Sequence, residues 1–154
     1  MDMNKPIPKG RNLPPLELLP EREWLNAKIT EVVYQQAVFM GKPAFLTDKD
    51  KNLVLDNDDK PIPNMEFKIT FALSNHSLHN GDPRRAWLNM GASLGKKAKL
   101  VKFCANMKIN TDGEFTPQTF IEATKGKEVK LQMANVEKEG KTYQNVVFDA
   151  VKPA

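Results

Sequence analysis

Cysteine and histidine are scarce in this sequence, and their scarcity excludes several kinds of site. Cys104 is the only cysteine, which excludes an internal disulfide framework and a multi-cysteine zinc site. The two histidines, His76 and His79, lie in one polar stretch that has no third ligand nearby, a pattern more typical of exposed loop side chains than of a metal centre. We therefore expect no metal and no cofactor, and the single thiol suits a reducing cytoplasm.

Long apolar runs are also missing. No stretch of about 18 apolar residues occurs, so we expect no membrane span. The first 20 residues contain five prolines but no continuous apolar segment of the kind found in signal peptides. The chain has 154 residues, of which 40% are hydrophobic and 27% are charged, and this balance predicts one compact cytoplasmic domain.

The sequence contains no recognisable catalytic pattern. The stretch GASLGKKAK, residues 91–99, has the wrong spacing for a phosphate-binding loop. Asp48, Asp50 and Asn52 match the first ligand positions of a calcium loop, but Leu53 stands where the sharp turn requires glycine. Because neither a nucleophile with its base nor a ligand cluster is evident, we expect a protein that is not an enzyme.

Charge is present but unevenly distributed along the chain. The net charge is +4, yet residues 1–83 carry a net charge of −2 and residues 84–154 carry +6. A basic half of this kind favours a polyanionic partner over an uncharged one, although a lysine-rich solvated surface gives the same pattern.

Alternation of apolar and polar residues predicts five strands, at residues 23–33, 65–73, 85–90, 127–138 and 141–151. In the first strand the alternation slips where Val32 and Val33 are adjacent, which predicts a bulge near Glu31. The last two strands form a hairpin through Glu139-Gly140. In the last strand the same alternation points Val146, Phe148 and Ala150 inward and Tyr143, Asn145 and Val147 outward.

Two helices are predicted between the third and fourth strands. The first covers about residues 94–108, with a buried stripe at Leu100, Phe103, Cys104 and Met107 and with Lys99, Lys102 and Asn106 on the opposite face. The second begins at Thr116 as N-cap with Pro117 at its first position.

The remaining segments flank or interrupt this domain. Residues 1–20 form an extended proline-rich arm, and residues 21–154 form a single domain. Within the domain, residues 40–64 are a long polar insertion in which AFLT and NLVL can pair as a hairpin.

Three strands, one or two helices and a final hairpin are the order of the OB-fold, a five-stranded Greek-key barrel with a helix between strands 3 and 4. The alternative is an α+β sheet with both helices on one face. We expect the mainly β OB-fold.

The motifs of the chain also resemble a family. Residues 19–153 are similar to phage-encoded OB-fold proteins, a group that includes single-stranded-DNA-binding proteins and members of unknown function. The matching positions are Leu19-Pro20-Glu21, Gly126-Lys127-Glu128-Val129, and Gly140, Tyr143 and Val146. The chain departs from the family pattern where Arg22 and Glu23 replace the usual glycine, and in the length of the insertion. The resemblance implies a role in phage DNA replication or recombination, in the cytoplasm of the host cell.

Two tryptophans and several cations fall on the outer phase of the predicted strands. In an OB-fold this face is the usual ligand surface. Aromatic rings stack on bases and cations neutralise phosphates, so the pattern predicts single-stranded DNA binding with little sequence preference. The candidate nucleic-acid-binding residues are Trp24, Lys28, Lys68, Arg85, Trp87, Asn89 and Tyr143.

The same features allow other interpretations. Either tryptophan can instead pack within its own chain, under the arm or the insertion. An OB-fold can also serve as a protein-interaction module without nucleic-acid binding, and LPPLELLP, residues 13–20, is a fair docking segment. Replication or recombination proteins are the expected protein partners, and a homo-oligomer is left open.

Overall fold

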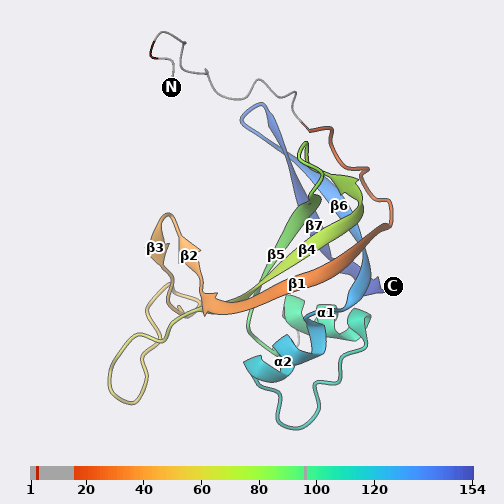
Figure 1. Ribbon diagram of the computed structural model, residues 1–154. Helices are drawn as coiled ribbons and strands as arrows, with labels where there is room; N and C mark the ends of the chain where they lie inside the picture. The colour runs from red at the N-terminus through yellow and green to blue at the C-terminus, as the bar shows by residue number, and fades with distance from the viewer. Residues whose placement is uncertain (1–2, 4–15, 96) are drawn as a thin grey trace.

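The computed structural model describes residue 3, residues 16–95 and residues 97–154. The elements follow in the order β1 (Leu25–Gln36), β2 (Val38–Phe39), β3 (Lys42–Pro43), β4 (Met65–Ser77), β5 (Pro83–Gly91), α1 (Lys99–Met107), α2 (Pro117–Thr124), β6 (Glu128–Lys138) and β7 (Lys141–Pro153). Figure 1 shows a curved sheet with both helices at one end and the segment between β1 and β4 projecting from its side. The predicted mainly β class with two helices is confirmed.

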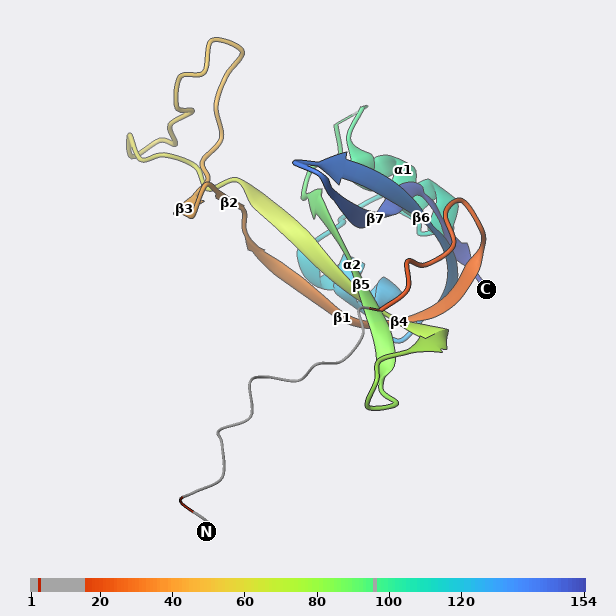
Figure 2. The same cartoon turned by 90° about the horizontal axis from the view of Figure 1, so that it is seen from above.

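The five long strands form one antiparallel sheet in the order β5-β4-β1-β6-β7. The sheet is open among the described residues, because β5 and β7 are its two edges and do not pair with each other. The sheet coils strongly enough that these edges approach one another (Figure 2). Residues from both edges line one cavity. The space between β5 and β7 is therefore accessible to a ligand.

A bulge in β1 allows this coiling. The register of β1 against β4 shifts between Ile29 and Glu31, so Thr30 is the extra residue and the predicted bulge is confirmed. Bulges bend a strand and increase its twist. The first four residues of β1 pair with β6 while most of its length pairs with β4, so β1 links the two halves of the sheet.

The core lies inside the curve of the sheet, under the two helices. The inward residues of β4 are buried as the alternation predicts, and so is the predicted stripe of α1. The N-cap of α2 is also as predicted, since Thr116 accepts a hydrogen bond from the Thr119 amide at 3.2 Å. The predicted start of the first helix at residue 94 is wrong. The helix begins at Lys99, because Gly95 lies in a turn and Ala98 is extended.

Burial of Cys104 within this core has a chemical consequence. Desolvation raises the pKa of the thiol from 9.0 to about 11, so the reactive thiolate is about a hundredfold scarcer at pH 8. We expect Cys104 to react slowly with an aromatic disulfide reagent in the folded protein and rapidly in denaturant. Absorbance of the released thiolate measures both rates. Equal rates in the two states would contradict the buried position.

The last strand departs from simple alternation. Met133 pairs with Val146 but Leu131 pairs with Val151, so residues 147–150 of β7 stand opposite Gln132 alone. The predicted inward position of Ala150 is wrong, because this bulge gives the core position to Val151. It also leaves Phe148 only half-buried.

The insertion contains more structure than the single predicted hairpin. Residues 37–64 form three tight turns, and the predicted pairing of AFLT with NLVL is present as a bridge between Thr47 and Leu53. Two rings of three backbone hydrogen bonds join the turns. One ring links Leu46, Val54 and Ile62, and the other links Ala37, Ala44 and Asn64. Asp48 and Asp56 each accept two backbone amides and thereby hold the turns they begin.

The predicted arm falls mostly outside the described residues, which begin again at Leu16. Its last part crosses from one sheet edge to the other. The Glu17 carbonyl accepts a hydrogen bond from Arg84 of β5 at 2.6 Å, and the Leu19 backbone exchanges two hydrogen bonds with the Gln144 side chain of β7. Leu19 is buried in the core. Residues 17–19 therefore hold β5 and β7 together at one end of the open edge.

Candidate nucleic-acid interface

Strand β5 presents one face to the core and the other to solvent. Ala86, Leu88 and Met90 are buried, whereas Arg85, Trp87 and Asn89 are exposed. The indole of Trp87 is 52% exposed. Tryptophan side chains are large and usually well buried, so an indole that is half exposed is uncommon. The exposed ring surface of Trp87 is free to stack on another ring.

The neighbouring strands add cations to the same face. Trp87 pairs with Thr70 and Asn89 pairs with Lys68 across β4 and β5. One row further along, Arg85 pairs with Ala72, which pairs in turn with Lys28 of β1. Directly paired residues lie about 5 Å apart and project to the same side. Five of the seven candidate residues, Lys28, Lys68, Arg85, Trp87 and Asn89, therefore share one face.

A cavity opens beside Trp87, at the edge where β5 faces β7. We call it the β5–β7 cavity; its volume is about 430 Å³, and it is lined by Trp87, Leu88, Asn89, Lys99, Asn145, Val146 and Phe148. The ammonium of Lys99 lies 5.2 Å from the centre of the Phe148 ring. Indole, phenyl ring, ammonium and two amides thus converge from β5, β7 and α1.

Sequence reasoning missed five of the seven lining residues, among them Lys99, Asn145 and Phe148. Lys99 is on the polar face of its helix, but nothing in the sequence says that this face meets the sheet edge. Phe148 reaches the cavity through the bulge in β7, which strict alternation does not reveal.

Trp24 does not join Trp87. It precedes β1 and lines a separate cavity that includes Asn106, Lys108 and Asp149. The ammonium of Lys152 lies 4.1 Å from the centre of its ring, a cation–π distance. The indole is 46% exposed, so it is an exterior side chain beside positive charge, with Lys152 over its ring.

Tyr143 lies on the β6–β7 hairpin, where it pairs with Val136. Both side chains are exposed. Tyr143 lies outside the linings described for the β5–β7 cavity and for the cavity beside Trp24. Of the seven candidate residues, Trp24 and Tyr143 are therefore placed apart from the other five.

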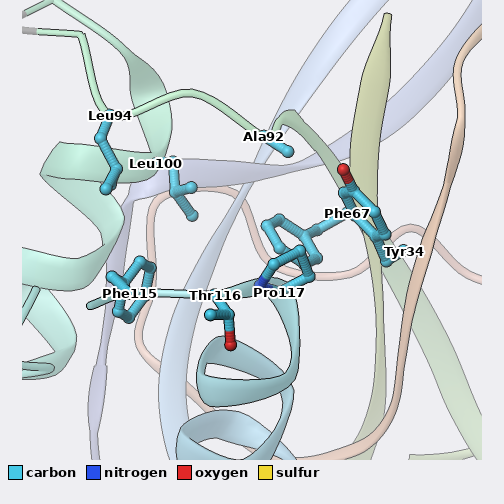
Figure 3. Close-up of a pocket in the computed structure, with 8 residues that line it drawn as sticks. All are labelled: Tyr34, Phe67, Ala92, Leu94, Leu100, Phe115, Thr116 and Pro117. Atoms are coloured by element: carbon cyan, nitrogen blue, oxygen red, sulfur yellow. The ribbon is translucent and has the colours of Figure 1, made fainter. Parts of the chain in front are cut away.

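Another hollow, which has no charged residue in its lining, lies between the sheet and the start of α2 (Figure 3). It has a volume of about 320 Å³ and is lined by Tyr34, Phe67, Ala92, Leu94, Leu100, Phe115, Thr116 and Pro117. The Tyr34 and Phe67 rings lie together at one side with centres 5.3 Å apart, and Leu94 and Phe115 lie across from them (Figure 3). No lining residue is charged, so this hollow suits an apolar side chain and not a phosphate.

The described ranges of the chain contain neither a cluster of metal ligands nor a membrane-spanning helix. No group of three or more His, Cys, Asp or Glu side chains there is arranged to hold a metal ion. The predicted loop position of His76 is wrong, because His76 lies within strand β4 and is half-buried. His79 lies in the following turn, and both histidines line a surface cavity with Glu17 and Arg84. Within the part of the chain that the structure describes, every helix is too short or too polar to cross a membrane.

The sequence matches no protein-family model and no curated protein. The resemblance to phage-encoded OB-fold proteins therefore stays a prediction that depends on its short motifs.

Proposed function

We propose that this protein binds single-stranded DNA with little sequence preference, in phage DNA replication or recombination. The observation that carries the proposal is the β5–β7 cavity, where a half-exposed indole and a lysine ammonium lie at the open edge of a sheet. Stacking of one base on an aromatic ring contributes about 1–3 kcal/mol and tolerates every base. A protein that used only this term and phosphate contacts would bind strands of any sequence.

The OB-fold is part of the proposal. It is supported by the strand order, by the position of both helices between β5 and β6, and by β1, which pairs with both β4 and β6. A partly open barrel is the usual form of this fold, and its ligands bind on the face and loops beside the opening.

The bound strand would run along the cationic face. One base would stack on Trp87, while Lys99, Arg85 and Lys68 meet the phosphates on either side. These side chains neutralise charge without reading bases. Duplex DNA keeps its bases stacked inside and cannot offer a base to the indole, so single strands are favoured.

Lysine and arginine substitutions test this electrostatic part. Each lost phosphate contact should reduce the slope of log K against log salt by about 0.7, because single strands release fewer counterions than duplexes. We expect Lys99→Ala and Arg85→Ala each to weaken oligo(dT) binding and to flatten this slope. Lys49→Ala, at an exposed lysine of the insertion, is the matched control and should change neither. If neither Lys99→Ala nor Arg85→Ala changes the slope of log K against log salt, the proposed face does not contact the phosphates.

A protein-interaction module is the second candidate function. It is favoured by the uncharged hollow of Figure 3, which offers aromatic and aliphatic walls and no group for a phosphate. An adaptor that used this hollow alone would bind a peptide through an apolar side chain. Oligo(dT) would then leave its tryptophan fluorescence unchanged, whereas strand binding at Trp87 quenches it.

A further inference from the structure

Two asparagines from opposite edges of the sheet line the β5–β7 cavity. Asn89 belongs to β5 and Asn145 to β7, and both line the cavity together with Trp87. Neither side-chain amide has a hydrogen-bond partner among the described residues. Each therefore presents a carbonyl acceptor and an NH₂ donor to whatever enters.

Stacking and phosphate contacts do not need these amides. A ring that lies on the Trp87 indole is held by its face, and the Lys99 ammonium pairs with a phosphate. The edge of the same base would point toward the two edges of the cavity, where the amides are. A cavity of about 430 Å³ lies within the range of about 300–1,000 Å³ for small-molecule sites, which admits a single base.

Two amides on opposite sides match one base better than the others. An amide pairs with a neighbouring amino group and ring nitrogen, as asparagine does with N6 and N7 of adenine. Adenine has two hydrogens on N6 and an acceptor ring nitrogen on each side of it, N1 and N7. Cytosine has an acceptor on only one side of its amino group, and guanine and thymine have a carbonyl in its place. Adenine is therefore the one base that can pair with an amide on each side of a single amino group.

We propose that the β5–β7 cavity is an adenine subsite, in which Asn89 and Asn145 bind the two polar edges of a base stacked on Trp87. This inference rests on the proposed binding of single strands and adds a preference at one nucleotide. The rest of the strand is held by contacts that do not distinguish bases, so the preference is confined to one nucleotide.

The test uses oligonucleotides of about 15 thymidines, within the range that one OB-fold covers, with a single central dA, dC, dG or dT. We expect the central dA to raise the affinity about tenfold over the other three, as measured by fluorescence anisotropy. A central 7-deaza-dA or 1-deaza-dA lacks one of the two ring acceptors, and each should lose most of the advantage.

Protein variants assign the preference to the two amides. Asn89→Ala and Asn145→Ala should each reduce the adenine advantage, the ratio of the affinity for the central-dA strand to that for oligo(dT), to about threefold or less. Asn57→Ala is the matched control, because Asn57 is an exposed asparagine of the insertion, and it should keep the full preference. Circular dichroism verifies that each variant is folded.

The outcomes separate this inference from the proposed function. Equal affinity for all four central bases, with oligo(dT) still bound, overturns the adenine subsite and leaves strand binding intact. A preference that survives both asparagine variants overturns the assignment to these amides. No binding to any of the oligonucleotides overturns both the subsite and the proposed function.

Discussion

Replacement of Trp87 by alanine is expected to weaken single-stranded DNA binding by more than about 1 kcal/mol, or about fivefold, while the protein stays folded. The side chain is half exposed and lies on the solvent face of β5, so its removal leaves the core intact. What it removes is the ring on which a base stacks at the edge of the β5–β7 cavity. Titration with oligo(dT) gives the affinity, and thermal unfolding gives the stability.

Two further variants make this result specific. Trp87→Phe keeps an aromatic ring and should recover part of the affinity. Phe39→Ala removes an aromatic side chain that is 72% exposed, in β2 and distant from the cavity in sequence, and should leave DNA binding unchanged. Unfolding of the alanine variant would assign Trp87 a core role instead, and unchanged affinity would remove it from the interface.

Replacement of Phe120 by alanine should have the largest effect on stability. Phe120 is fully buried, and its ring lies among three others, with centres 4.4 Å from Phe67, 5.9 Å from Phe103 and 6.3 Å from Phe115. These contacts join α2 to the sheet, to α1 and to the preceding loop. A buried phenylalanine changed to alanine costs about 3–5 kcal/mol, because apolar burial is lost and a cavity remains.

Denaturant unfolding measures this loss against the same exposed control. Phe39→Ala removes the same atoms from a solvent-exposed site and should change the free energy of unfolding by less than about 0.5 kcal/mol. A similar small change at Phe120 would mean that α2 does not pack on the sheet as described.

The periodic parts of the fold can be predicted from sequence. Strand β4 alternates without interruption and α1 carries a four-residue apolar stripe, so burial alone decides which side of each element faces inward. The outward direction of Trp87 follows from the same reasoning, because Ala86 and Leu88 on either side of it fill core positions.

The remaining parts depend on contacts between distant segments. Helix α1 begins only at Lys99 because a turn at Gly95 precedes it. In β7, a bulge opposite Gln132 determines which of the last residues face the core. Neither the turn nor the bulge produces a periodic pattern of apolar and polar residues in the sequence. The cavity itself depends on how far the sheet coils, which brings Lys99 and Phe148 beside Trp87 although the chain separates them by more than ten residues. For the same reason Trp24, which has the same outward phase, lies at a different place on the surface.

The most direct test of the account is one titration of the full chain with labelled single-stranded and double-stranded oligonucleotides of the same sequence, at two salt concentrations. We expect the single strand to bind more tightly than the duplex, binding to quench the tryptophan fluorescence, and affinity to fall steeply as salt is added. Equal binding of both forms, or no binding to the single strand at the lower salt concentration, would contradict it.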